Sequence, residues 1–283
     1  MADHGGKRVA GTPASVSVDL DHGGRWTSLR LAGREWLWRR DDPRRGHVAP
    51  GDPFADAGGL EECVPTVRGQ PDHGCAWARP WRDLGGGCAE ADCGRFTLWR
   101  SIAVRDAGVT AAYRLTADPG YQFVWAAHAL LDVSQSATLQ LPPDTPVRLY
   151  PEAAPLLARP WPDGAPFITG RWPGPDGIRL DRLGPDDGTA IGAIALGTGC
   201  ATVCDGEGRL SLRLRSAADL PLSVALWRNL RGFGDGQRYR SIGVEPMLGG
   251  VFDLAQAGGE DDAVTVPAAG SVEWELEIAG TPS

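Results

Sequence analysis

The chain has 283 residues, a formal net charge of −8, and many glycines (39) and prolines (23). The negative charge argues against nucleic acid and anionic membrane as partners, because clustered cations bind both. Residues 1–16 contain no apolar run typical of a signal peptide, and no stretch approaches the roughly 18 apolar residues of a membrane span. We therefore expect a cytoplasmic protein.

Short segments in which apolar and polar residues alternate recur along the chain and predict β-strands. Segment 209–215 alternates three leucines with four polar residues, and segment 272–278 repeats the pattern. Further strands are expected at 15–20, 26–31, 96–104, 109–115, 123–133 and 189–196. Turn residues separate them, and no convincing amphipathic helix, repeat or linker is seen. The pattern predicts one all-β domain of residues 1–283, a large antiparallel β-sandwich.

Two further features of the chain lie outside these strands. Segment 149–175 is rich in proline, glycine and tryptophan, so we expect a long loop that lines a site. The six cysteines have no zinc-ribbon spacing, which favours reduced thiols over a metal site or a disulfide framework. No phosphate-binding loop or metal-binding motif is present, and we expect neither a cofactor nor a metal.

His128 lies in a strand-like segment that is apolar on both parities, so both sides of the strand are expected to be covered. A histidine there needs a hydrogen-bond partner or a wet cavity. On a regular strand Ala126 shares the face of His128, whereas Trp125 points the other way. The small alanine neighbours indicate room for a ligand, and the alternative is a buried histidine bonded to the backbone.

His73 lies in a turn-like Asp72-His73-Gly74 segment and is followed by Trp77, Arg79 and Trp81. A histidine in a loop is often simply solvated. If this segment is extended, however, Trp77 and Trp81 share the face of His73. Aromatic rings pack against the apolar faces of a pyranose, and a guanidinium donates to its oxygens. We therefore predict that Arg79, Trp77 and Trp81 bind a sugar.

Glu245 follows Ile242 and Val244, whose spacing predicts that they face the core. Gly243 would then share the face of Glu245 and leave space in front of a carboxylate, although a surface glutamate is the alternative. Glu61 and Glu62 are weaker candidates for ligand contacts. A carboxylate and two imidazoles on one scaffold could move protons on and off a sugar hydroxyl and ring oxygen.

In this order, six short motifs resemble the aldose 1-epimerase (galactose mutarotase-like) family, in its divergent bacterial branch. They are Gly24-Arg25-Trp26-Thr27-Ser28-Leu29, Gly33-Arg34-Glu35-Trp36-Leu37-Trp38, Gly58-Gly59-Leu60-Glu61-Glu62-Cys63-Val64-Pro65-Thr66, Pro71-Asp72-His73-Gly74, Trp125-Ala126-Ala127-His128 and Ser241-Ile242-Gly243-Val244-Glu245-Pro246. The resemblance spans nearly the whole chain. It implies a β supersandwich with the ligand in an open cleft across one sheet.

The resemblance also implies roles for the three candidate catalytic residues. Glu245 would take the proton from the anomeric hydroxyl, His128 would protonate the ring oxygen, and His73 would hold or polarise that oxygen. Galactose-type members also use an arginine before the first histidine and an aspartate in mid-chain. Arg68 is the stand-in for the arginine, and Asp163 or Asp176 for the aspartate.

The sequence thus predicts an aldose 1-epimerase (mutarotase) acting on a small-molecule sugar, as a monomer or homodimer. Two alternatives remain open: a non-catalytic carbohydrate-binding protein, and an epimerase of a modified sugar on the same fold. Arg79 and Arg82 would suit an acidic or phosphorylated sugar.

Overall fold

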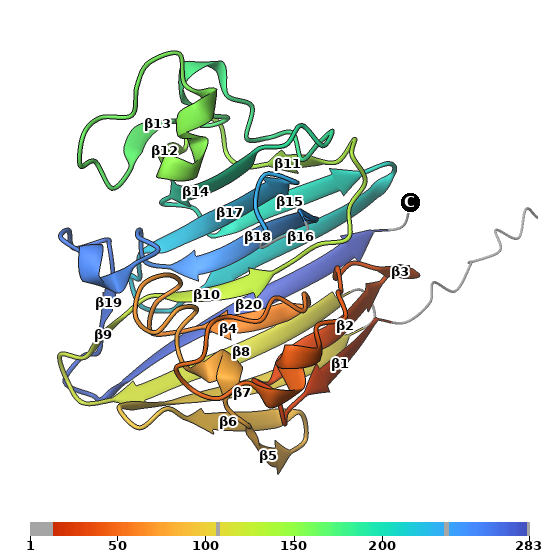
Figure 1. Cartoon of the computed structure of the whole chain (residues 1–283). Coiled ribbons are helices and arrows are strands. Elements are labelled where there is room, and N and C mark those ends of the chain that lie inside the picture. Colours follow the sequence, from red (N-terminus) through yellow and green to blue (C-terminus); the bar gives the residue numbers. More distant parts are fainter. Residues whose placement is uncertain (1–13, 106–107, 235–237, 282–283) are drawn as a thin grey trace, which may run out of the picture.

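The computed structural model describes residues 14–105, 108–234 and 238–281, which form two large antiparallel sheets and one small sheet. The two large sheets stack as layers (Figure 1). This arrangement confirms the predicted all-β sandwich.

The larger sheet carries the residues discussed below. Its strands, in pairing order, are β1 (Ser15–Asp19), β2 (Arg25–Leu31), β4 (Leu60–Cys63), β10 (Trp125–Ala129), β18 (Arg240–Leu248), β17 (Leu222–Leu230), β14 (Ala190–Leu196), β12 (Pro146–Leu149) and β13 (Ile168–Arg171), with β3 (Arg34–Glu35) paired to β2.

The second large sheet, of eight strands, packs on the other side of the core. Its strands, again in pairing order, are β11 (Thr138–Gln140), β15 (Cys200–Asp205), β16 (Gly208–Arg215), β20 (Ser271–Thr281), β8 (Gly108–Ala117), β7 (Phe96–Arg105), β6 (Cys88–Asp92) and β5 (Arg82–Gly85). Strands β19 (Val264–Thr265) and β9 (Gln122–Phe123) form the two-stranded sheet.

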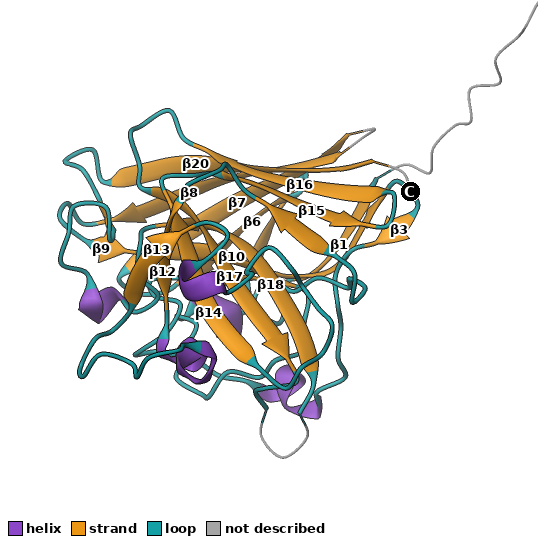
Figure 2. Cartoon of the chain, turned by 90° about the horizontal axis from the view of Figure 1, so that it is seen from above, coloured by secondary structure: helices purple, strands orange, loops and turns teal. Residues whose placement is uncertain are grey.

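Short 3₁₀ helices and long connections lie mostly on the side of the larger sheet that faces away from the second sheet (Figure 2). The helices are η1 (Pro43–His47), η2 (Ala76–Ala78), η3 (Pro151–Leu156), η4 (Pro175–Gly177) and η5 (Leu254–Gln256). Segment 149–175, expected as one loop, contains η3 and β13. Within the described ranges, no helix has the length and apolar character needed to cross a membrane.

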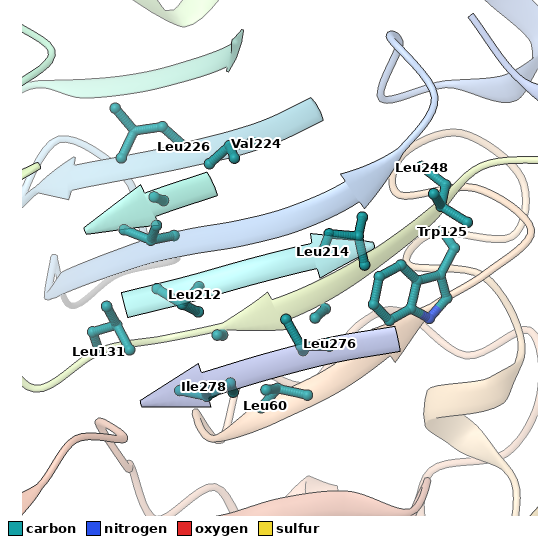
Figure 3. Packing of buried hydrophobic residues seen from close by; sticks show 14 of the residues in the cluster. Leu60, Trp125, Leu131, Leu212, Leu214, Val224, Leu226, Leu248, Leu276 and Ile278 are labelled. Carbon is teal, nitrogen blue, oxygen red and sulfur yellow. The ribbon is translucent and has the colours of Figure 1, made fainter. Parts of the chain in front are cut away.

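The core between the sheets follows from the alternation in the sequence. In β16 every second residue is buried, and in β20 Leu276 and Ile278 are buried in the same way. Figure 3 shows these side chains facing Leu60 and Trp125 of the larger sheet. Burial of apolar surface is the main favourable term in folding, so this interior stabilises the stacking of the two layers.

Strand β10 is buried on both faces, as its sequence predicted. Trp125, Ala127 and Ala129 belong to the core between the sheets, whereas Ala126 belongs to a second apolar cluster on the outer face. Because alternate residues of a strand point to opposite faces, His128 shares the outer face with Ala126. By the same parity Ile242 and Val244 of β18 enter the core and Glu245 points outward.

Candidate active site

A cavity of about 500 Å³ lies over the outer face of the larger sheet. Its volume falls in the range of about 300–1,000 Å³ that small-molecule sites occupy. His73, His128 and Glu245, which lie far apart in the sequence, all line it. The cavity is also lined by Arg40, Arg44, Pro53, Phe54, Asp56, Val67, Arg68, Asp72, Leu130, Glu152, Trp227, Phe233, Gly234, Tyr239 and Phe252.

His128 and Glu245 form the floor of the cavity. The pairing of β10 with β18 places Ala126 opposite Met247, and the bridge between Leu130 and Gly243 continues this register, so His128 lies opposite Glu245. His128 Nε2 is 3.7 Å from Glu245 Oε1. Only 7% of His128 and 2% of Glu245 are exposed, so both groups are largely withdrawn from water.

Burial shifts the pKa values of the two groups toward each other. Desolvation raises the pKa of Glu245, and the attraction of His128 opposes this only in part. Desolvation lowers the pKa of His128, again against the attraction of Glu245. The shifts favour the neutral form of each group. An imidazole and a carboxyl group at this spacing can each exchange a proton with a ligand bound in the cavity.

Gly243 provides the space in which the Glu245 carboxylate sits. A Cβ atom on Gly243 would lie 2.4 Å from Glu245 Oε1, closer than any side chain allows. The second oxygen, Oε2, is buried and has no hydrogen-bond partner among the described residues. A buried acceptor without a partner costs free energy, so a donor on a bound ligand would be favoured here.

His73 reaches the cavity from the connection that follows β4. Its backbone adopts a left-handed conformation, with φ of 58°. The ring lies 5.1 Å from the His128 ring, centroid to centroid, and nearly perpendicular to it. Phe54 stacks on the His73 ring at 3.6 Å between centroids and also meets the His128 ring edge to face at 5.6 Å, while His73 Nδ1 lies 3.0 Å from Asp72 Oδ1. These contacts fix the orientation of the imidazole.

Arg68, the expected stand-in for the family arginine, also lines the cavity. Its Nη1 donates to Glu152 Oε1 at 2.6 Å, and its guanidinium lies 4.4 Å from the centre of the Phe252 ring. Gly192 leaves room for it, because a Cβ atom there would lie 2.5 Å from Arg68 Nη2. Glu152 belongs to η3, so segment 149–175 does line the cavity as expected.

Two residues predicted to bind a sugar through their aromatic rings lie elsewhere. The segment after His73 is not extended but turns into η2, which breaks the expected alternation. Trp77 is 1% exposed, lies beneath Phe54, and donates its Nε1 proton to the Gly74 carbonyl. Trp81 is buried in the core and stacks on the Arg100 guanidinium.

The carboxylates predicted to contact a ligand also lie outside the cavity. Glu62 points between the sheets, where it accepts hydrogen bonds from Arg100, Tyr113 and Trp125. Glu61 is on the outer face but is buried against Arg45. Asp163 and Asp176 are exposed and do not line the cavity.

The two arginines suggested to bind an acidic or phosphorylated sugar are likewise outside the cavity. Arg79 lies beside Cys75, away from the cavity lining. Arg82 is an exposed residue of β5 and pairs with Glu90.

Comparison with solved structures identifies the fold. No family model matches the sequence, and no match is found among the curated proteins. A provisionally assigned aldose 1-epimerase of Escherichia coli K12 aligns with a TM-score of 0.69 and 14% identity over 96% of this chain and 97% of that one. A galactose mutarotase-like protein of Lactobacillus casei ATCC 334 aligns with a TM-score of 0.60 and 16% identity over 95% and 98% of the two chains. The protein Slr1438 of Synechocystis sp. PCC 6803 gives a TM-score of 0.65 and 14% identity over 96% and 93%.

The chain has the galactose mutarotase-like fold.

In this galactose mutarotase-like fold, aromatic residues that were not predicted from the sequence also line the walls of the cavity. Trp227 of β17 points to the outer face, while Phe233 and Tyr239 come from the connection between β17 and β18. Tyr239 donates to Asp56 Oδ2 at 2.5 Å and stacks on Trp38. Trp227 alternates with Ser223, Ala225 and Asn229, so the pattern separates it from Val224 and Leu226 of the core but does not show that its face lines a cavity.

The described residues of this galactose mutarotase-like fold include no cluster of metal-binding side chains. Within residues 14–105, 108–234 and 238–281, no group of three or more histidine, cysteine, aspartate or glutamate side chains is arranged to hold a metal ion.

Proposed function

We propose that this protein is an aldose 1-epimerase (mutarotase) that interconverts the α and β anomers of a sugar. The observation that carries the proposal is the 3.7 Å separation of His128 Nε2 and Glu245 Oε1 at the floor of the cavity. Ring opening takes a proton from the anomeric hydroxyl and gives one to the ring oxygen. Both oxygens are bonded to the anomeric carbon, so the base and the acid must lie close together.

The reaction then needs no redox step. Glu245 takes the hydroxyl proton while His128 gives a proton to the ring oxygen, the bond between that oxygen and the anomeric carbon breaks, and a free aldehyde forms. Rotation about the bond to the aldehyde carbon presents its other face. The ring closes with the proton carriers in exchanged roles, and His73 holds the ring oxygen throughout. Each positioned group can contribute about 10²–10⁴-fold.

The walls favour a neutral aldose over a sugar phosphate or a sugar acid. The walls contain three arginines, Arg40, Arg44 and Arg68, and three carboxylates, Asp56, Asp72 and Glu152, so cations are not in excess. A site for a phosphate would have an excess of cations. Trp227 offers an apolar ring face against which a pyranose can pack.

Exchange spectroscopy by NMR tests the activity directly. The exchange between α and β signals should be measured over a panel of aldoses, sugar phosphates and uronic acids, with and without folded protein. We expect acceleration for at least one neutral aldose. No acceleration above buffer for any sugar would overturn the proposal.

Two substitutions assign the roles of the floor residues. His128→Ala and Glu245→Gln should each lower turnover by about two or more orders of magnitude. Asp163→Asn is the matched control, because this exposed carboxylate lies outside the cavity and its loss should leave turnover unchanged. Circular dichroism checks that each variant is folded.

One observation favours a non-catalytic carbohydrate-binding protein as the second candidate. Neither Asp163 nor Asp176, the candidates for the family aspartate, lines the cavity, and Glu152 is already paired with Arg68. Calorimetric binding of a sugar without faster exchange of its anomers would select this function. A change at another carbon, found by product analysis, would instead select a different epimerase on the same scaffold.

A further inference from the structure

A second cavity, of about 480 Å³, is lined in part by the connection that carries His73. Its lining includes Gln70 and Pro71 of that connection, together with Arg95 and Tyr121. Two cysteines, Cys75 and Cys93, also line it and are free thiols. The proposed sugar chemistry makes no use of this cavity.

The two thiols come from different layers of the fold. Cys75 is the residue before η2, and its amide donates to the Val64 carbonyl at 2.8 Å. Cys93 belongs to the turn between β6 and β7, where its amide donates to the Phe96 carbonyl at 2.9 Å. Cys93 packs in the main core, and the half-buried Cys75 packs against it, with its Sγ donating to the Val64 carbonyl at 3.7 Å. Both side chains line the same cavity.

The surroundings make the two thiols chemically different. The nearby Cys93 thiol and the charge of Arg79 lower the pKa of Cys75, although burial opposes this. The interaction with Cys75, followed by burial, raises the pKa of Cys93. The Nε atom of Arg79 is buried without a hydrogen-bond partner among the described residues, so no carboxylate neutralises the guanidinium through this atom. A thiolate beside a cation and a second thiol is the arrangement of redox-active cysteines.

We propose that Cys75 and Cys93 form a redox-active thiol pair, which a hydroperoxide entering this cavity converts to a disulfide. The Cys75 thiolate attacks one oxygen of hydrogen peroxide, the O–O bond breaks, and the departing oxygen takes a proton to leave as water. This step oxidises Cys75 to a sulfenic acid. The Cys93 thiol then attacks the Cys75 sulfur, a second water leaves, and the disulfide remains. Two thiols and one peroxide thus give one disulfide and two waters.

The disulfide would join the two layers at a point two residues from His73. The His73 amide donates to the Val67 carbonyl at 3.0 Å, and the Gly74 amide donates to the Pro71 carbonyl at 2.9 Å, so the connection is already folded back on itself. A covalent bond to the turn between β6 and β7 would restrict it further. Hydrogen exchange of residues 69–75 should therefore slow on oxidation.

Peptide mapping tests the pair without reference to any sugar activity, so its outcome is independent of the proposed function. Trypsin releases Cys75 in peptide 69–82 and Cys93 in peptide 83–95, which also contains Cys88. We expect one equivalent of hydrogen peroxide to link these peptides in the wild-type protein and in Cys88→Ser. In Cys93→Ser the reaction should stop at the Cys75 sulfenic acid, which dimedone traps.

Two further variants test the cause of the reactivity. Arg79→Gln should slow linkage, because the charge of Arg79 lowers the pKa of Cys75 and so increases its thiolate fraction. Cys200→Ser, which removes an exposed thiol, should leave the rate unchanged. Oxidation of Cys200 ahead of any Cys75–Cys93 linkage in the wild-type protein would overturn the proposal, as would linkage to Cys88 at the same rate. The wild-type measurement stands even if a variant fails to fold.

Discussion

Replacing Glu62 by glutamine tests whether the Glu62 side chain stabilises the fold or binds a ligand. Glu62 is fully buried between the sheets and pairs with Arg100, which is 1% exposed, at 2.8 Å. Tyr113 Oη and Trp125 Nε1 also donate to it, at 3.0 and 2.8 Å. An amide has one acceptor oxygen for these three donors and no charge to balance the guanidinium.

The expected loss of stability follows from this geometry. Removing one partner of a buried ion pair costs about 3–5 kcal/mol, because the other charge stays buried. For a chain of this size we expect the Tm to fall by roughly 10 °C. Urea unfolding followed by tryptophan fluorescence gives the change in the free energy of unfolding.

Two controls sharpen this measurement. Glu90→Gln breaks an exposed pair with Arg82 and should change stability by less than about 1 kcal/mol. Replacing both Glu62 and Arg100 by apolar residues should cost less than Glu62→Gln, since no charge is left unpaired. An unchanged urea midpoint for Glu62→Gln, together with weaker sugar binding, would refute the structural role.

Three further predictions concern the cavity and its surroundings. Anomer exchange should slow at low pH, where Glu245 becomes protonated and cannot act as the base, and at high pH, where His128 has no proton to give. Since burial raises the pKa of Glu245 and lowers that of His128, NMR exchange rates should show a narrower optimum than free side chains would give. Gly192→Ala should displace Arg68 and weaken sugar binding about tenfold by calorimetry, with little loss of stability. Burial raises the pKa of Glu61 from 4.5 to about 7, so the folded protein binds an extra proton between these values and its stability falls as pH rises through them. Urea midpoints of Glu61→Gln should lack this slope.

Strand parity explains how much of the site could be predicted from the sequence. The alternation around Glu245 places Ile242 and Val244 in the core and the carboxylate outside, as the structure has it. The same rule puts His128 on the face of Ala126. Where a segment is a regular strand, knowing the faces of a few apolar residues fixes the faces of the rest.

The alternation rule gives wrong predictions where the backbone is not a regular strand. Trp77 and Trp81 were assigned to the face of His73 on the assumption of an extended segment, but His73 has a positive φ and η2 follows. Both indoles consequently turn into the interior. In β4 the adjacent residues Glu61 and Glu62 point to opposite faces of the sheet. Their apolar neighbours are buried on both faces, so the sequence does not show which glutamate faces the core.

Residues that line the walls could not be predicted, because their proximity arises only in three dimensions. Phe54, Tyr239 and Glu152 come from three connections that meet over the sheet. None lies in a periodic segment, so no local pattern marks it as facing a ligand.

The division between a floor made of strands and walls made of connections has a consequence for how this scaffold can change. The spacing of His128 and Glu245 is set by the backbone hydrogen bonds of two central, adjacent strands, whereas Phe54, Phe233 and Tyr239 sit on segments that tolerate insertion and replacement. Exchanging those segments should redirect which ligand is accepted while the distance between the two floor groups is preserved. Variants with changes only in residues 48–56 and in the β17–β18 connection are therefore the first to test for altered ligand specificity.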